Sequence, residues 1–157
     1  MTILPKEGTP APAFTAINAE EKSVSLDQFT GKWVVIYFYP KALTPGCTVQ
    51  ACALRDGMSV LKSLNVEVMG ISPDAPKTLK KFANAENLNF QLLSDSEHTI
   101  AVSYGAWQEK SMYGRTYMGM ARMTVAVNPE GKIAKVWPKV DPKDHYDEVL
   151  AFINATS

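Results

Sequence analysis

Runs of apolar residues, separated by segments with helical spacing, predict strands that alternate with helices. Residues 33–39 are continuously apolar and rich in β-branched and aromatic side chains, which is typical of a strand covered on both faces. A second strand is predicted over residues 66–71 and a helix over Pro76–Glu86. A short extended segment at 90–93 and a helix at 97–104 follow. This alternation indicates parallel strands joined by helical crossovers.

The two ends of the chain predict antiparallel pairing. Near the start, residues 13–17 and 23–26 flank a polar segment and form a predicted hairpin. Near the end, Met123–Val127 and Ile133–Trp137 flank a turn rich in Asn, Pro and Gly, and a helix is predicted over 143–154. We therefore expect one α/β domain over residues 1–157, with a central mixed β-sheet, flanking helices and an N-terminal β-hairpin extension.

A helix is also predicted over residues 45–64, directly after the first long strand. Thr44 is a favoured N-cap residue, and Pro45 suits the first helical position. The apolar face that we expect to be buried contains Val49, Cys52, Ala53, Val60, Leu61 and Leu64.

Composition and charge narrow the function classes. The 157 residues include 16 basic and 16 acidic side chains without blocks of one sign, which argues against nucleic-acid binding and membrane anchoring. The longest apolar stretch is far below the roughly 20 residues of a membrane span, and residues 1–15 lack the apolar core of a secretory signal. We expect a cytoplasmic protein, where structural disulfides are rare and two cysteines indicate chemistry.

Cys47 falls in the first turn of the predicted helix, where free backbone N–H groups and the helix dipole favour an anion. A free thiol has a pKa of about 8.5, yet the thiolate is the nucleophile. The dipole supplies about one pKa unit, so a cationic neighbour is also needed. Sequence spacing leaves four candidates open: Lys41, Arg55, Arg115 and Arg122.

Cys52 follows five positions later. On a regular helix, the two Cα atoms would lie about 8.7 Å apart and about 140° around the axis. A disulfide tolerates a Cα separation of up to about 7 Å, so pairing requires the first turns to unwind. The spacing suits a bond made transiently during turnover.

Other interpretations compete with this one. Both cysteines could be small core residues. A thioredoxin-like oxidoreductase would have two residues between its cysteines instead of four, and a zinc site would require His98 and His145 at unusual spacing. A Cys-His hydrolase lacks a recognisable signature. We expect both histidines to be exposed or capping, and the methionines of residues 112–123 to serve core and loop packing.

Residues 40–47, Pro-Lys-Ala-Leu-Thr-Pro-Gly-Cys, resemble the active-site motif of the peroxiredoxins. Residues 48–56 resemble the bacterioferritin comigratory protein branch, also called Q-type peroxiredoxins, and the likeness extends to residues 8–14, 89–95 and 121–124. The resemblance implies a thioredoxin-like fold and a monomeric thiol peroxidase that needs neither a metal nor an organic cofactor.

The same resemblance assigns roles to individual residues. Cys47 would be the peroxidatic cysteine and Arg122 the active-site cation, while Thr44 would hydrogen-bond the peroxide. The supporting residues would be Pro40, which shields the pocket, Gly46 within the motif, and Gln50, which steadies the arginine. Some family members place the resolving cysteine on the following helix, near positions 82 and 83, where this chain has Phe and Ala. Cys52 is then the intramolecular resolver.

Turnover would reduce hydrogen peroxide or organic hydroperoxides, and thioredoxin or a similar dithiol would reduce the Cys47–Cys52 disulfide. A redox-sensing or chaperone-like protein that uses the same disulfide as a switch is the alternative.

Overall fold

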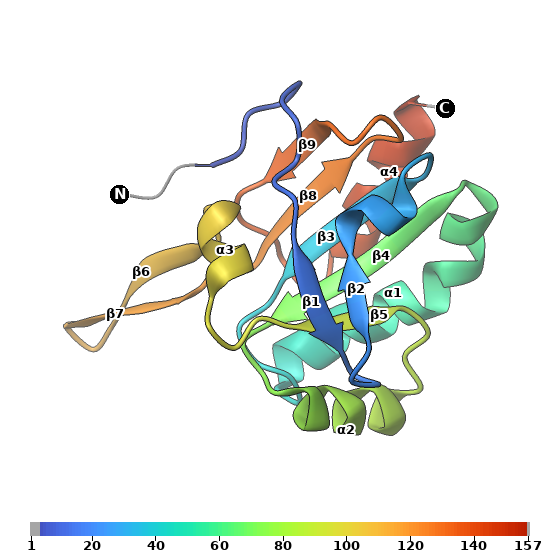
Figure 1. The fold of residues 1–157 in the computed structure, drawn as a ribbon. Helices are drawn as coiled ribbons and strands as arrows, with labels where there is room; N and C mark the ends of the chain where they lie inside the picture. The colour runs from blue at the N-terminus through green and yellow to red at the C-terminus, as the bar shows by residue number, and fades with distance from the viewer. Residues whose placement is uncertain (1–3, 157) are drawn as a thin grey trace.

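The computed structural model describes residues 4–156. Its main feature is a seven-stranded sheet in the order β2-β1-β5-β4-β3-β8-β9, with a separate two-stranded ribbon formed by β6 and β7 (Figure 1). The strands are β1 Thr15–Asn18, β2 Ser23–Ser25, β3 Trp33–Phe38, β4 Val66–Ser72, β5 Gln91–Ser94, β6 Trp107–Met112, β7 Arg115–Met120, β8 Met123–Val127 and β9 Ile133–Trp137. The helices are α1 Pro45–Ser63, α2 Pro76–Glu86, α3 Thr99–Ser103 and α4 His145–Thr156, and Leu26–Phe29 forms a 3-10 turn.

The pairing confirms the predicted mixed sheet. Strands β3, β4 and β5 are parallel, as expected for strands joined by helices. Both flanks are antiparallel: β1 pairs with β2 and β5, and β8 pairs with β3 and β9. The predicted hairpins at the two ends of the chain therefore form the two outer parts of the sheet.

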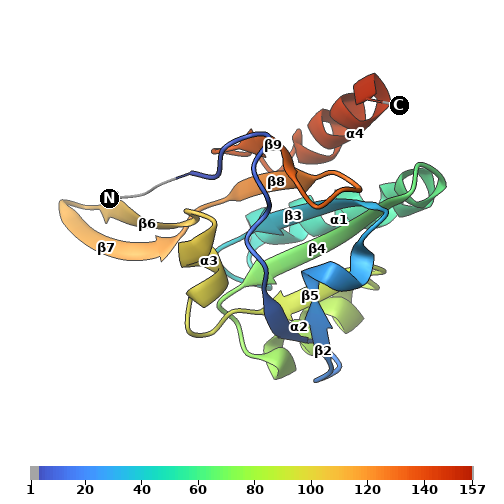
Figure 2. The ribbon, with the colours of Figure 1, turned by 45° about the horizontal axis from the view of Figure 1, so that its top comes forward.

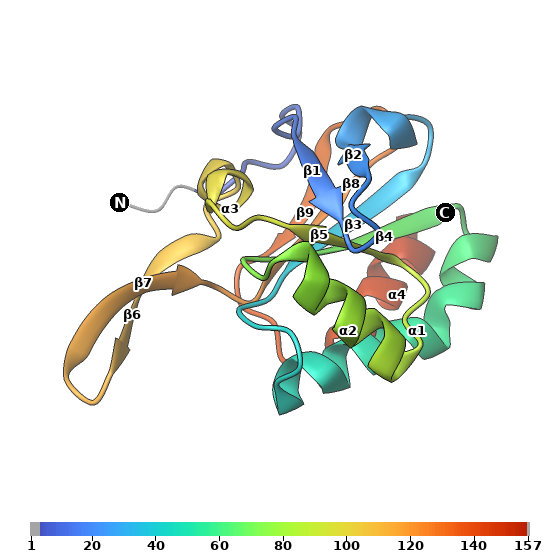
Figure 3. The same cartoon turned by 60° about the horizontal axis from the view of Figure 1, so that its bottom comes forward.

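Helices cover the two faces of the sheet unequally. Helices α1, α2 and α4 pack on one face, which Figure 3 shows from their side, and their apolar residues share a core with Val35, Tyr37 and Val68. The other face is covered by α3, by Tyr104, by the segment before β1 and by the 3-10 turn after β2. Within residues 4–156, no helix combines the length and apolar character that crossing a membrane requires.

The buried face of α1 differs from the predicted one. Val49 and Val60 were expected inside, but they are 47% and 44% exposed. The buried face instead consists of Cys47, Gln50, Ala51, Leu54, Gly57, Met58 and Leu61. The buried side of α1 includes a Gln and a Gly, which hydrophobicity does not mark as buried. The prediction therefore assigned the buried face to the more hydrophobic valines, which face outward.

The segment expected to be loop and core filler is the β6–β7 hairpin, which projects from the body of the molecule (Figure 2). Met112 and Met118 are about half exposed on it, whereas Met120 and Met123 are buried where the chain rejoins the sheet. The packing prediction is therefore wrong for the projecting part and confirmed for its base.

A close approach between α1 and α4 fixes the position of the last helix. The ring of Tyr146 lies directly over Gly57, so that a Cβ atom at position 57 would overlap the ring. This contact holds the N-terminal end of α4 against the middle of α1, and that end begins with His145.

We predict that Gly57→Ala destabilises the protein by about 1–3 kcal/mol, because the new methyl group overpacks the Tyr146 contact. Alanine is intrinsically better than glycine in a helix by about 0.5–1 kcal/mol, so the steric effect must exceed the gain in helix propensity. Urea unfolding of the wild type and the variant measures the net change in the free energy of unfolding. In a Tyr146→Ala background the same change should become neutral or stabilising; a loss of equal size there would contradict the packing explanation.

Candidate active site

Helix α1 begins where it was predicted to begin. Thr44 has the extended backbone of an N-cap residue, with φ −88° and ψ 155°, and Pro45 occupies the first helical position. The Thr44 hydroxyl does not cap the helix; it donates to the Lys41 carbonyl at 2.7 Å. The Thr48 N–H bonds back to the Thr44 carbonyl at 2.9 Å, so Cys47 lies in the first turn, where its own N–H has no intrahelical acceptor.

The loop before the helix is held by Asp74. One Asp74 carboxylate oxygen accepts from the Ala42 N–H at 2.7 Å and from the Ser72 hydroxyl at 2.8 Å. The next residue, Leu43, has a left-handed backbone with φ +67° and an exposed side chain. A left-handed conformation is costly for a residue with a branched side chain, and such strain persists only where neighbours enforce it.

Cys47 is 1% exposed and contacts an arginine from a distant part of the chain. The Arg122 Nη1 donates to Cys47 Sγ at 3.3 Å. Of the other candidate cations, Arg55 pairs with Asp56 and donates to the end of α2, and Lys41 and Arg115 are exposed. Among the four candidates, the structure thus brings Arg122 to the thiol.

Arg122 lies in the connection between β7 and β8. Its carbonyl accepts from the Val140 N–H at 3.1 Å, and the preceding Ala121 N–H donates to Ala106 at 2.7 Å. Gly46 gives the guanidinium room, since a Cβ atom there would stand 3.3 Å from Arg122 Nη2. A glycine directly before the cysteine therefore lets the arginine lie across the helix start.

Three buried polar side chains form a series of hydrogen bonds that begins at Arg122. Arg122 Nη1 also donates to Gln50 Oε1 at 2.8 Å, and Gln50 Nε2 lies 3.1 Å from His145 Nδ1. His145 Nε2 lies 2.8 Å from Thr124 Oγ1. His145 is 1% exposed, so the prediction that it is an exposed or capping residue is wrong. Burial, and secondly the charge of Arg122, lowers the pKa of His145 to about 4.

Sequence reasoning also missed Lys110. This half-buried side chain of β6 packs over Gly119 on the hairpin face. Burial, and secondly the charge of Arg122, lowers the pKa of Lys110, while Cys47 opposes this shift. No local signal marks Lys110 or His145, because Lys110 comes under the influence of Arg122 and Cys47, and His145 comes beside Gln50, only in the folded chain.

Cys52 faces a different environment from Cys47. Its half-buried thiol donates to Glu86 Oε2 at 3.4 Å, at the end of α2, where Arg55 also donates to the Glu86 carbonyl at 2.6 Å. Burial and the hydrogen bond to Glu86 raise the pKa of Cys52. Both cysteines are free, and α1 is unbroken between them.

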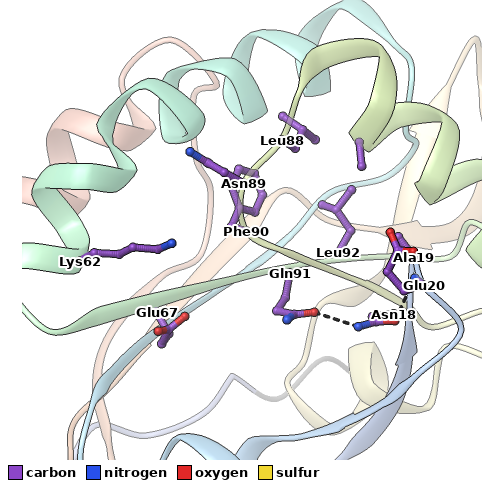
Figure 4. A pocket seen from close by; sticks show the side chains of 11 residues that line it. Asn18, Ala19, Glu20, Lys62, Glu67, Leu88, Asn89, Phe90, Gln91 and Leu92 are labelled. Carbon is purple, nitrogen blue, oxygen red and sulfur yellow. Dashed lines mark hydrogen bonds between the residues drawn. The ribbon is translucent and has the colours of Figure 1, made fainter.

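A cavity of about 320 Å³ between α1, α2 and β5 is separate from this arrangement. Figure 4 shows the Asn18–Gln91 hydrogen bond, 3.1 Å long, at one end of it and Lys62 with Glu67 at the other. None of the predicted site residues lines it. Among residues 4–156, no three His, Cys, Asp or Glu side chains gather closely enough to hold a metal ion.

We predict that Glu86→Gln lowers the pKa of Cys52, because it removes both a carboxylate acceptor of the thiol and a nearby negative charge. In a Cys47→Ser background, alkylation of Cys52 by iodoacetamide at pH 8 should become about threefold faster. Glu130→Gln, a change at an exposed turn far along the chain, is the matched control. An unchanged or slower reaction in Glu86→Gln would show that Glu86 does not control this thiol.

The buried imidazole predicts a pH dependence of stability. His145 in the unfolded chain binds a proton below about pH 6.5, but the folded protein binds it only near pH 4. Stability present above pH 6.5 is therefore lost as the pH falls towards 4, by about 3 kcal/mol in all. Urea unfolding of the wild type and His145→Asn between pH 7.5 and 4.5 isolates this component, since the carboxylates are common to both. A pH-independent difference would contradict a neutral buried His145.

Comparisons with known proteins identify the family. The family model of the AhpC/TSA family matches residues 8–136. The chain is 51% identical over 148 residues to a putative peroxiredoxin bcp of Haemophilus influenzae, covering 94% of this chain and 96% of that protein. It is 46% identical over 148 residues to the peroxiredoxin Bcp of Escherichia coli, covering 94% and 95%.

Solved structures agree with these relatives. The bacterioferritin comigratory protein of Xanthomonas campestris, studied for its alkyl peroxide reduction activity, superposes with a TM-score of 0.90 at 29% identity, over 96% of this chain and 99% of that one. A peroxiredoxin Q structure from the same organism gives 0.88 at 29% identity, over 98% and 97%. The predicted thioredoxin-like fold is confirmed. The chain belongs to the AhpC/TSA family, as a peroxiredoxin of the Bcp type and a thiol-dependent peroxidase.

Proposed function

We propose that this peroxiredoxin reduces peroxides with Cys47, that Cys52 resolves the oxidised sulfur, and that Arg122 is the cation that activates the thiol. The observation that carries the proposal is the 3.3 Å contact between Arg122 Nη1 and Cys47 Sγ at the start of α1. A buried thiolate requires such a partner, because burial of an unpaired charge is strongly unfavourable.

The donors around Cys47 suit a peroxide held end-on to the sulfur. Arg122 Nη1 donates to the sulfur, and the Cys47 N–H, in the first turn of α1, has no intrahelical acceptor and can donate to a peroxide oxygen. The Thr44 hydroxyl already donates to Lys41, so its lone pairs can accept the O–H of a hydroperoxide. Pro40 and Gly46 are half-buried, and we propose that Pro40 limits the access of water to the sulfur.

The thiolate then attacks the nearer peroxide oxygen along the O–O axis. A sulfur–oxygen bond forms as the O–O bond breaks, and the departing oxygen takes up a proton and leaves as water or alcohol. Cys47 is left as a sulfenic acid. The fixed donors stabilise the negative charge that moves onto the departing oxygen, which is the main catalytic contribution expected of such a site.

Resolution requires α1 to open at its start. Cys47 is buried against the sheet, and Cys52 is bound to Glu86 of α2. When the first turns unwind, the Cys52 sulfur can attack the sulfenic sulfur; a disulfide bond forms and water leaves. An external dithiol, for which we propose thioredoxin, restores both thiols by exchange. We further propose a cytoplasmic, monomeric enzyme that binds neither membranes nor nucleic acid.

The central experiment measures peroxide consumption with thioredoxin, thioredoxin reductase and NADPH. Cys47→Ser should abolish turnover of hydrogen peroxide and of an organic hydroperoxide. Cys52→Ser should lower thioredoxin-dependent turnover by at least about tenfold while the first oxidation of Cys47 keeps its rate, because resolution follows attack. Full turnover in Cys52→Ser would refute its role as resolver. A wild type that is oxidised once but does not turn over would favour the redox-sensing alternative.

Arg122 is tested against a matched arginine. Arg122→Gln should lower the rate of Cys47 oxidation by roughly 100-fold, the effect of losing one preorganised donor. Arg115→Gln, an exposed change on the neighbouring strand β7, should keep the wild-type rate. Equal rates for the two variants would contradict the assignment of Arg122.

A further inference from the structure

We propose that His145 is a positioning residue of the peroxidatic site, acting through Gln50 on Arg122. The inference rests on the proposed roles of Cys47 and Arg122. It starts from a continuous series of contacts in which Thr124, His145 and Gln50 are each no more than 1% exposed.

The donors and acceptors in this series allow one arrangement. An arginine side chain can only donate, so the Gln50 oxygen must face Arg122, and the Gln50 amide nitrogen then faces His145. His145 Nδ1 must accept from that nitrogen. Its proton therefore resides on Nε2, which donates to the Thr124 hydroxyl.

A second protonation state would break the arrangement. With a proton on Nδ1, His145 could no longer accept from Gln50, whose amide would have to turn and point its NH₂ group at the guanidinium. Arg122 would then lose one of the two acceptors that hold Nη1. The neutral imidazole is the state favoured here, because the side chain is buried and lies near the charge of Arg122. The centroid of the Tyr37 ring is 5.5 Å from that of the imidazole.

His145 is the first residue of α4, and the fold fixes its position. Its backbone N–H is fixed by the Asp141 carbonyl at 3.0 Å, and the next residue, Tyr146, packs on Gly57 of α1. The helix that ends the chain thus orients a side chain on the helix that carries Cys47. Two other buried polar side chains among residues 4–156 are engaged away from the sulfur: Asp95 binds N–H groups of α3, and Asn18 binds its own turn and Gln91.

Three variants separate the two imidazole nitrogens. In His145→Asn, the side-chain oxygen can replace Nδ1 as the acceptor for Gln50. In His145→Gln, the amide reaches the Nε2 position and the acceptor facing Gln50 is lost. Thr124→Val keeps the shape of the side chain but removes the acceptor for Nε2–H, which favours the wrong tautomer. His98→Asn is the matched control, since His98 stacks on Trp107 away from the network.

Two readouts are measured for each variant: the second-order rate constant for hydrogen peroxide, and the pH profile of Cys47 alkylation in a Cys52→Ser background. We expect His145→Gln and Thr124→Val to lower the rate constant about tenfold, the effect of one hydrogen bond to a charged group. Their alkylation profiles should move to higher pH. The loss in rate constant should be at least about threefold smaller for His145→Asn than for His145→Gln. The rate constant of His98→Asn should match that of the wild type.

Wild-type rates and profiles in folded His145→Gln and Thr124→Val would overturn the proposal. So would equal losses in His145→Asn and His145→Gln, since a purely structural role would not distinguish the two nitrogens. Urea unfolding identifies variants that are not folded under the assay conditions, and Gln50→Leu then serves as the second variant, with the same loss expected. If the wild type consumed no peroxide, the proposed function would fail, but the alkylation profiles would still test whether His145 acts on Cys47.

Discussion

The contact between Arg122 and Cys47 is the constraint around which the site is organised. A thiolate at a buried helix start must be paired, and its partner is itself a cation that requires acceptors when half-buried. Satisfying both charges joins three segments that are distant in the sequence: the start of α1, the connection between β7 and β8, and the start of α4. Strands β3 and β8 are neighbours in the sheet. Because α1 follows β3 and Arg122 directly precedes β8, this pairing brings Arg122 beside the start of α1.

The same helix must also release Cys47, and its two ends are built differently. The start has a proline and a glycine, no side-chain cap and a left-handed Leu43 just before it. The middle is held by fully buried Leu54 and by the Gly57 contact with α4. The Tyr37 hydroxyl, in the core layer shared with Cys47, is buried and has no hydrogen-bond partner among the described residues. An unsatisfied buried hydroxyl costs about 1–3 kcal/mol. The backbone at the start of α1 is therefore less well secured than its middle, and the hydrogen bonds of Cys47 and Gln50 hold this start in the folded state.

Much of this architecture was predictable, because local chemistry determines it. The apolar run ending in β3, the Thr44-Pro45 start of α1 and the final hairpin each depend on neighbouring residues, and the structure has them where they were expected. The buried face of α1 was not predictable from hydrophobicity, since Gln50 and Gly57 are buried for a hydrogen bond and a ring contact with distant residues. Arg122 could be selected by family resemblance but not by spacing. His145 could not be found at all, because its polar partners come from α1 and β8 and meet only after folding.

Gln50 links activation of the thiol to its release. It lies between Cys47 and Cys52, so the unwinding that brings the two sulfurs together must displace it from Arg122 and His145. The guanidinium then loses its sulfur and its amide acceptor in one step, and the network exists only while α1 is wound. With an apolar side chain at position 50, opening of the helix would break only the contact between Arg122 and Cys47. With glutamine there, the wound helix is stabilised by the hydrogen bonds that orient Arg122, so positioning of the cation and retention of the folded start rest on the same contacts.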